Sequence, residues 1–243
     1  MDQERKIIQL YQDVTSIPGY VELLDYMGDD GLTCVNAARV SFDQKSETLS
    51  KRDHNLLEYL LKNRHTSVFE HNVLTFSFKV PLFVARQHMR HRTWSFNEVS
   101  RRYTNSNLDF YLPEFFREQS ESNRQGSLLT STHDPVLDTI HGTFMDHLHK
   151  ASEAVKLHVK DSLKLYDKML KGGICKEQAR IVLPQNLYTR YWGTVNLNNF
   201  IKFIALRDHE HAQKEIQEMA KACKSLVKQV WPNIIELYEK NKE

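Results

Sequence analysis

Cysteine is scarce in this chain of 243 residues, and the three that occur, Cys34, Cys175 and Cys223, share no C-x-x-C spacing. Such a set neither builds a disulfide framework nor supplies the thiolate pairs of a structural zinc site. We therefore interpret each cysteine as a small buried apolar residue.

Histidine is more frequent, but its spacing does not favour a metal site. Two of the histidines near the middle of the chain lie two positions apart, where helical side chains diverge, and no acidic partner accompanies them. The HEH triplet at 209–211 is not the H-E-x-x-H of zinc enzymes. We predict no metal at any of these positions, which are His65, His71, His141, His147, His149, His158, His209 and His211.

Long apolar runs are also missing. None approaches the length of about 20 residues that a membrane-spanning helix needs, and 40% hydrophobic with 26% charged residues is usual for soluble globular proteins. The opening MDQERKIIQLYQDV lacks the apolar centre of a signal peptide, and its acidic residues are unlike a transit peptide. The expectation is a cytoplasmic protein with no membrane partner.

No excess of charge marks the chain as a whole, since its net charge is +2 and its pI is near 8.3. A protein whose main partner is bulk nucleic acid usually has a pI above about 9. There is also no linker, no internal repeat and no G-x-G-x-x-G. The sequence therefore predicts one domain spanning 1–243, of the α+β class, with an antiparallel sheet flanked by long helices and no dinucleotide-binding βαβ unit.

Hydrophobic periodicity and turn residues give the expected order of elements. Strands are expected at 20–27, 72–80 and 187–195, the second with one buried face. Residues 1–19 are expected to be an N-terminal extension, and 117–133 a mobile surface insertion because it is strongly polar. Helices are expected at 3–14, at 32–42, from an N-cap at Asp53 to Arg64, from Pro81 through His91, from Asp134 to Gly172, around Glu177 and Arg180, from 200 to about 230, and after Pro232.

The run at 90–103, RHRTWSFNEVSRRY, carries four arginines and one histidine against a single acid, Glu98. Guanidinium groups bind phosphate or carboxylate bidentately, so the run predicts an anionic ligand. Two plainer interpretations remain open: a capping box of Ser95 with Glu98, and a helical pair of Glu98 with Arg102. Arginines interleaved with aromatic residues are also typical of a nucleic-acid surface.

Further along the chain, Arg207 and His211 stand one helical turn apart. Because two cationic groups at this spacing repel, the pair also indicates an anion between them. Ser41 could bond its own backbone, and Arg180 could pair with Glu177 three positions earlier.

The run at 90–103 matches, position for position, the R-H-R-x-x-S-x-N-E-x-S-x-R-Y signature of the flavin-dependent thymidylate synthases. The resemblance extends through ARVSF at 38–42, FEH at 69–71, RIVLP at 180–184, NLYTRYWGTVN at 186–196 and LRDHEHAQ at 206–213. Only about the first twenty residues and 117–133 look unlike that family.

This resemblance implies a methyltransferase that converts dUMP to dTMP without a cysteine nucleophile. The one-carbon donor would be the folate 5,10-methylenetetrahydrofolate, and NADPH would be the reductant through bound FAD. It further implies a homotetramer with active sites at subunit interfaces. A phosphate-binding flavoprotein acting on another substrate remains an alternative.

The resemblance also implies roles for individual residues, with Arg207 as the catalytic residue that activates the uracil ring. In the family pattern, the position two after Asn196 is arginine and the position six after is asparagine, so the flavin contacts of Asn198 and Lys202 are in question here. The implied dUMP contacts are Gln87, Arg90, Glu98, Ser100, Arg102, Arg180 and Arg207. The implied FAD contacts are Ser41, His65, Ser67, Glu70, Arg90, His91, Arg92, Thr93, Glu98, Asn196, Asn198, Lys202, Leu206 and His211.

Overall fold

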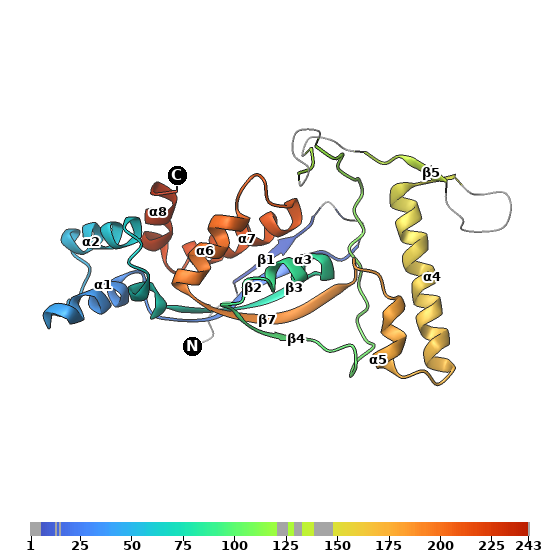
Figure 1. Ribbon diagram of the computed structural model, residues 1–243, viewed down its shortest axis with the longest axis horizontal. Helices are drawn as coiled ribbons and strands as arrows, with labels where there is room; N and C mark the ends of the chain where they lie inside the picture. The colour runs from blue at the N-terminus through green and yellow to red at the C-terminus, as the bar shows by residue number, and fades with distance from the viewer. Residues whose placement is uncertain are drawn as a thin grey trace.

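The computed structural model describes residues 6–12, 14, 16–120, 126–128, 133–138 and 148–242. A five-stranded antiparallel sheet in the order β1-β2-β3-β7-β4 lies at its centre, with helices on one face and at both ends (Figure 1). The predicted α+β fold with an antiparallel sheet is confirmed. Its strands are β1 (Lys6–Leu10), β2 (Gly19–Met27), β3 (Val73–Pro81), β4 (Ser95–Glu98) and β7 (Tyr188–Asn196), and a separate hairpin joins β5 (Val136–Asp138) to β6 (Leu148–Lys150).

The helices follow the sequence pattern at most positions. The short helices η1 (Val40–Phe42), η2 (Thr66–Glu70) and η3 (Arg180–Val182) are of the 3-10 type. The α-helices are α1 (Leu32–Arg39), α2 (Lys51–Lys62), α3 (Leu82–His88), α4 (Ala151–Lys171), α5 (Lys176–Ala179), α6 (Leu197–Arg207), α7 (Lys214–Lys228) and α8 (Pro232–Lys240). No described helix is both long and apolar enough to cross a membrane.

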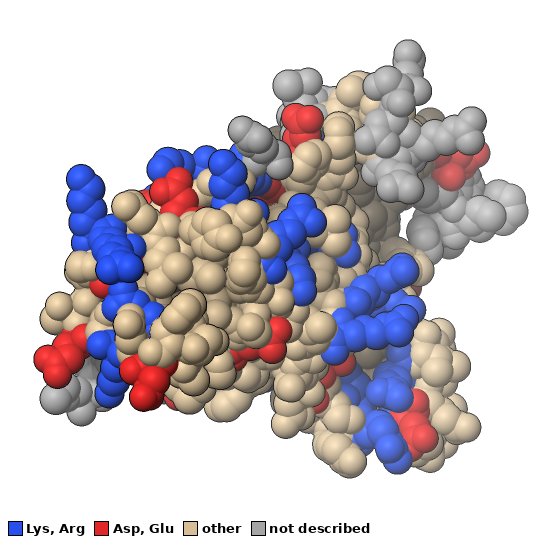
Figure 2. Space-filling model, turned by 60° about the vertical axis from the view of Figure 1, so that its left-hand side comes forward, with Lys and Arg blue, Asp and Glu red and all other residues tan. Residues whose placement is uncertain are grey.

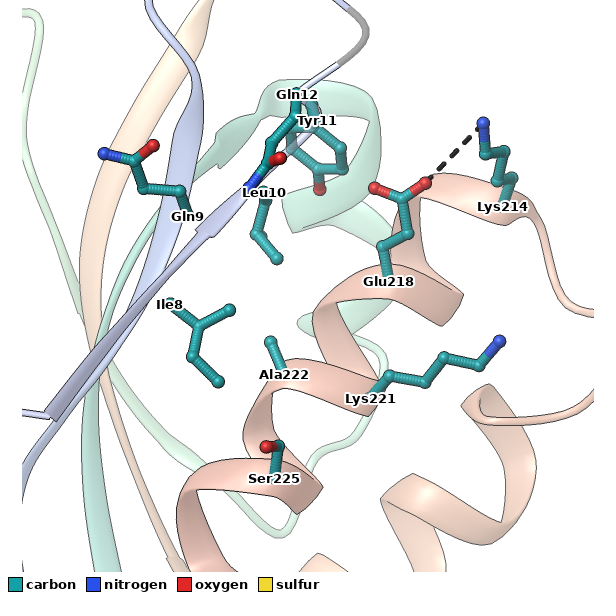
Figure 3. A pocket seen from close by; sticks show the side chains of 10 residues that line it. All are labelled: Ile8, Gln9, Leu10, Tyr11, Gln12, Lys214, Glu218, Lys221, Ala222 and Ser225. Atoms are coloured by element: carbon teal, nitrogen blue, oxygen red, sulfur yellow. Dashed lines mark ion pairs between the residues drawn. The ribbon is translucent and has the colours of Figure 1, made fainter.

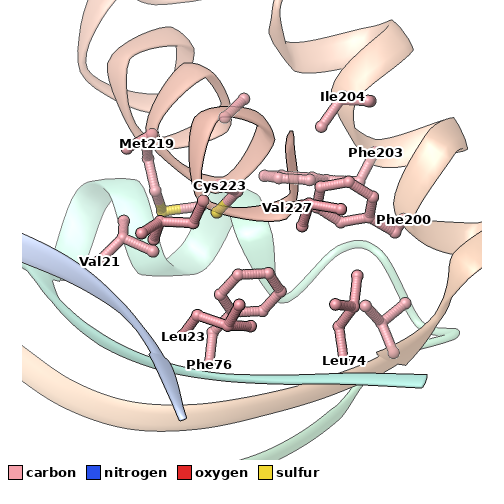
Figure 4. Close-up of a cluster of buried hydrophobic side chains, with 14 of the residues drawn as sticks. Val21, Leu23, Leu74, Phe76, Phe200, Phe203, Ile204, Met219, Cys223 and Val227 are labelled. Carbon is pink, nitrogen blue, oxygen red and sulfur yellow. The ribbon is translucent and has the colours of Figure 1, made fainter. Parts of the chain in front are cut away.

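The core forms where β3 presents alternate side chains to the helices. Leu74, Phe76, Phe78 and Val80 are fully buried, as their alternation predicts. Phe200 and Phe203 of α6 and Met219, Cys223 and Val227 of α7 pack over this face (Figure 4). The opposite face of β3 is less open than expected, because Lys79 is also buried and its Nζ lies 2.9 Å from a carboxylate oxygen of Asp109.

The first described residues form a strand, so the helix predicted at 3–14 is wrong. β1 pairs antiparallel with β2, from Lys6 opposite Leu23 to Leu10 opposite Gly19. Ile8 and Leu10 point toward α7, where Ala222 lies on the facing side of a shallow groove (Figure 3). The apolar residues of this short run satisfy both a helical period and an alternating one, and pairing with β2 decides between them.

The start of α2 corrects the predicted N-cap. Ser50 is the N-cap, and Asp53 is the third helical residue of a capping box in which each side chain bonds the other's backbone. The hydrogen bonds from Ser50 hold the pKa of the Asp53 carboxyl below its usual range, with a smaller contribution from the charge of Arg39. Leu57 and Leu60 of this helix are buried in the core.

The long helix predicted from Asp134 begins later, at Ala151. Asp134 does bond the first turn of a helix, but it lies well before α4. The backbone N–H of Ser152 donates to Oδ1 of Asp134 and the Ser152 hydroxyl donates to Oδ2, both at 2.8 Å. The residues between form the hairpin strands, except for 139–147, which lie outside the described residues together with His141 and His147. The end of the helix is confirmed, since α4 stops at Lys171 before Gly172.

The helix predicted from 200 to about 230 is two helices, α6 and α7. Asp208 ends α6, and its buried carboxylate lies 2.6 Å from Nζ of Lys224, on α7. The chain turns at 208–213 before α7 begins, and this ion pair ties the turn to α7. His211 therefore lies in a turn, not one helical turn beyond Arg207.

Candidate active site

The arginine-rich run lies at the end of α3 and along β4. α3 stops at His88, so Arg90 and His91 lie beyond the helix that was predicted to run through His91. Ser95 and Glu98 lie on β4, opposite Thr194 and Tyr191 of β7. Both helical interpretations of Glu98 are therefore wrong.

A buried histidine anchors the run from below. The Nδ1 atom of His88 lies 2.9 Å from the hydroxyl of Tyr191, and its ring packs edge-on against Trp94 at 4.4 Å and Phe78 at 5.0 Å. Burial lowers the pKa of His88 well below its ordinary value, so the ring is neutral. The neutral ring packs in the core and so holds the start of the run against it.

Arg207 and His91 meet across the site. The Nε atom of Arg207 donates a hydrogen bond of 3.1 Å to Nε2 of His91, which must therefore be unprotonated. Burial and then the Arg207 charge lower the pKa of His91 to about 4. Burial and the nearby charge of Arg90 likewise lower the pKa of Arg207. The neutral imidazole of His91 thus accepts a hydrogen bond from the Arg207 guanidinium, which lies near the guanidinium of Arg90.

The guanidinium groups here lack acidic partners. Among the described residues, no carboxylate forms an ion pair with Arg90, Arg92 or Arg207, although Arg102 and Arg117 do have such partners. On the molecular face in Figure 2, Lys and Arg form separate groups with neutral surface between them. The arrangement favours a discrete anionic ligand over a long polyanion.

The state of His91 gives a direct test of this geometry. We expect its NMR titration midpoint near pH 4 instead of the ordinary 6.5. In Arg207→Ala the midpoint should rise only part of the way, because burial remains. The unfolded chain binds more protons between these values, so the contribution of His91 to stability is complete above about pH 6.5 and is lost toward pH 4. A midpoint unchanged by the substitution would contradict the contact.

A second basic group lies at α5. One Nη atom of Arg102 is 2.9 Å from the carboxylate of Glu177, and Nε of Arg180 donates to the backbone oxygen of Glu177 at 3.2 Å. All three side chains are largely exposed. The alternative pairing of the Arg180 and Glu177 side chains is not formed, and the Glu177 carboxylate occupies an anion position beside the Arg102 guanidinium. Arg101, in contrast, is taken up by the carbonyls of Ser106 and Asn107.

Glu98 and Ser100, between these two groups in the sequence, are each held by a hydrogen bond. The hydroxyl of Thr189 on β7 donates to Oε1 of Glu98 at 2.6 Å. The hydroxyl of Ser100 accepts the backbone N–H of Arg102 at 3.2 Å. Thr189 is a contact that sequence reasoning missed, because nothing in a strand sequence reveals its neighbour across the sheet.

The remaining candidate residues surround η2 and α6. Ser67 and Glu70 are exposed on η2, and the exposed His65 is the residue just before it. Asn198 donates to Oε1 of Glu70 at 3.3 Å. Asn198 and Lys202 line a cavity of about 460 Å³ at this end of α6. The side chain of Asn196 is used as the N-cap of α6, 2.9 Å from the backbone nitrogen of Asn199. Thr93, Leu206 and His211 are exposed near the signature run and the end of α6.

One chain does not bring all of these residues into a single site. Ser41 on η1 directly follows α1, while Arg180 directly follows α5, and α1 and α5 lie at opposite ends of the molecule (Figure 1). The candidate residues near η1 and η2 (Ser41, His65, Ser67 and Glu70), here called the η1 cluster, thus lie at the opposite end of the sheet from Arg102 and Arg180, here called the α5 cluster.

Apolar side chains beside these clusters are left uncovered. Their exposed fractions are 75% for Phe42, 78% for Tyr103, 76% for Ile181 and 58% for Leu206. Large apolar groups this open, next to candidate binding residues, mark an interaction surface.

Comparison with known proteins identifies the family. Residues 22–233 match the family described as thymidylate synthase complementing protein. The flavin-dependent thymidylate synthase of Thermosipho melanesiensis is 38% identical over 222 residues, which cover 91% of each chain. That of Treponema denticola is 36% identical and covers 100% of this chain and 84% of its own.

A solved structure has the same fold. The crystal structure of a UMP/dUMP methylase from Streptomyces cacaoi bound with 5-Br UMP superposes with a TM-score of 0.74. It is 31% identical and covers 97% of both chains.

Proposed function

The chain belongs to the family of flavin-dependent thymidylate synthases and is a methyltransferase, and from this premise we propose that it converts dUMP to dTMP. The proposal includes 5,10-methylenetetrahydrofolate as one-carbon donor and NADPH as reductant through bound FAD. The observation that supports it most strongly is the contact of Arg207 with neutral His91, beside guanidinium groups without described acidic partners.

The chemistry of the donor set fits FAD. A dinucleotide carries a pyrophosphate, and Arg90, Arg92 and their backbone neighbours offer charge-assisted donors for it. We assign to FAD binding the residues Ser41, His65, Ser67, Glu70, Arg90, His91, Arg92, Thr93, Glu98, Asn196, Asn198, Lys202, Leu206 and His211. When bound, FAD supplies the hydride transfer from NADPH that reduces the one-carbon unit.

Arg207 is assigned to the uracil ring of dUMP. Negative charge grows on the uracil carbonyl oxygens as C5 becomes electron-rich, and a preorganised guanidinium stabilises it. His91 holds Nε of Arg207 at 3.1 Å, which leaves the two terminal nitrogens of the guanidinium for the substrate. Gln87, Arg90, Glu98, Ser100, Arg102 and Arg180 are assigned to the rest of the nucleotide, with the phosphate replacing the Glu177 carboxylate beside Arg102.

Catalysis without a cysteine nucleophile is also proposed. Cys34 and Cys223 are fully buried, and burial raises the pKa of the Cys34 thiol to about 12. Cys175 is exposed, which corrects the prediction that all three are buried, and its sulfur lies 3.8 Å from Gln178.

We therefore expect the triple variant Cys34→Ala, Cys175→Ser, Cys223→Ala to form dTMP within about threefold of the wild-type rate, with a lower melting temperature from the two buried sites. Product formation is measured on protein whose FAD content and melting curve show that it is folded. Loss of dTMP formation in such protein would sink the cysteine-free mechanism.

A homotetramer with shared active sites is the assembly that we propose. The separation of the η1 and α5 clusters supports it, as do the uncovered side chains of Phe42, Tyr103 and Ile181. Residues 1–243 would act as one domain, with 1–19 as an extension and 117–133 as an insertion. Of the predicted insertion, residues 121–125 and 129–132 lie outside the described residues.

The first experiment is an absorption spectrum of protein purified without added cofactor, followed by NADPH oxidation with and without dUMP. Flavin bands with dUMP-stimulated oxidation support the proposal, and labelled folate then tests methyl transfer. A colourless protein that cannot be loaded with FAD would instead favour nucleic-acid binding. Yellow protein that does not respond to dUMP would favour another substrate.

A further inference from the structure

A buried carboxylate, that of Glu215, is connected to Gln87, which is assigned to the nucleotide. Glu215, in the first turn of α7, is 5% exposed. One terminal nitrogen of Arg117 lies 2.8 and 3.0 Å from its two oxygens, and the hydroxyl of Tyr111 lies 3.3 Å away. Arg117 is itself held by Ser127 at 2.9 Å. Glu215 is thus a fixed negative charge with a matching cation.

The carboxylate connects to Gln87 through one side chain. Nε2 of Gln213 lies 2.8 Å from Oε2 of Glu215, and Oε1 of Gln213 contacts Nε2 of Gln87. Gln87 is half-buried on α3, and Gln213 is half-buried just before α7. The two amides therefore form a short relay between the buried ion pair and the candidate nucleotide site.

The Glu215 carboxylate determines which end of each glutamine amide donates and which accepts. An ionised carboxylate only accepts, so Gln213 must turn its NH₂ group toward Glu215 and its oxygen toward Gln87. That oxygen in turn requires the NH₂ group of Gln87. Among the described residues, no hydrogen bond uses the other end of the Gln87 amide, so its carbonyl oxygen is left for a ligand.

We propose that Glu215, held by Arg117, is a positioning residue that fixes the Gln87 amide with its oxygen facing a hydrogen-bond donor of the nucleotide. The inference rests on the proposed function, because dUMP offers two neutral donors, the uracil N3–H and the 3′-hydroxyl of the deoxyribose. It also gives a task to Arg117, at the start of the segment that departs from the family pattern.

The test is the affinity of the FAD-loaded protein for dUMP, read from the change in flavin absorbance. Gln213→Leu breaks the relay without touching the buried ion pair, and Glu215→Gln gives the relay a donor where only acceptors stood. We expect each variant to raise the Kd for dUMP roughly five- to tenfold, as for one lost hydrogen bond. The double variant should be no weaker than the single ones, because both act through the same amide.

Two analogues identify the donor, N3-methyl-dUMP and 2′,3′-dideoxyuridine monophosphate. The one that lacks the partner of Gln87 should bind wild type and Gln213→Leu equally. The other analogue should bind Gln213→Leu more weakly than wild type, by the same factor as dUMP does. The matched control is Gln9→Leu, an exposed glutamine on β1, which should leave every Kd unchanged.

Three results would overturn the positioning role. The effects of the two substitutions on the Kd for dUMP could add in the double variant, or Gln213→Leu could leave the Kd unchanged. In the third, Gln213→Leu weakens the binding of dUMP and of both analogues by the same factor. If Glu215→Gln fails to fold, Gln213→Leu carries the test alone. Wild-type protein that holds FAD but binds no dUMP is a different outcome, because it refutes the proposed function and not the relay.

Discussion

Replacing Arg207 with alanine should slow dTMP formation by roughly a thousandfold or more, while the protein keeps its FAD. The guanidinium is assigned to stabilise charge that develops on the uracil ring, and removing one such preorganised donor commonly costs a factor of 10²–10³. The effect is expected at or above the upper end of this range, because His91 holds the Arg207 guanidinium in place before the charge develops. Formation of dTMP with dUMP, the folate and NADPH present measures it.

Two further variants define what Arg207 contributes. Arg207→Lys keeps the charge but not the planar fork, so its rate should lie between those of wild type and Arg207→Ala. Arg86→Ala removes an exposed arginine of α3 that has no assigned role, and it should behave like wild type. Wild-type turnover by folded, flavin-loaded Arg207→Ala would remove Arg207 from the mechanism.

Phe78→Ala should cost about 3–5 kcal/mol of unfolding free energy, the range for truncating a buried aromatic residue. The Phe78 ring is fully buried, stacks on Tyr191 at 4.9 Å and meets His88 edge-on at 5.0 Å. The resulting cavity would lie directly under the anchor of the arginine-rich run, so the affinity for dUMP should fall as well. Thermal unfolding of the FAD-loaded protein at fixed concentration measures the first effect, and flavin absorbance measures the second.

The control for Phe78 is Ile17→Ala. Ile17 is 62% exposed, and truncating a surface side chain changes stability by no more than about 0.5 kcal/mol. A melting temperature of Phe78→Ala equal to that of Ile17→Ala would contradict the packing described for β3 and α3.

Local pattern predicted the central strands well, because β2, β3 and β7 combine clean alternation with turn residues at their ends. It failed at Lys6–Leu10, where five residues are too few to separate a helical period from an alternating one. It failed again after Asp134, whose capping partner Ser152 lies 18 positions away in the sequence. A sequence window cannot reveal a bond across such a distance.

Some residues of the candidate site could be predicted from local sequence, and others could not. Arg90, Glu98 and Arg102 could be found because they lie in one short run whose residue types already indicate an anion. The contact between Arg117 and Glu215 joins residues 98 positions apart, and a glutamate at the start of a helix is unremarkable until its burial is known. Long-range partners of this kind depend on the tertiary fold and leave no local pattern.

Because the η1 and α5 clusters lie at opposite ends of the molecule, folding of a single chain does not by itself complete a catalytic centre. With the proposed assembly, a correctly folded single copy holds two unmatched halves of a catalytic centre, and neither half works alone. The number of working centres then follows mass action, so it falls faster than the amount of protein when the chain becomes scarce. Thymidylate output would respond to synthesis of this protein more steeply than in simple proportion.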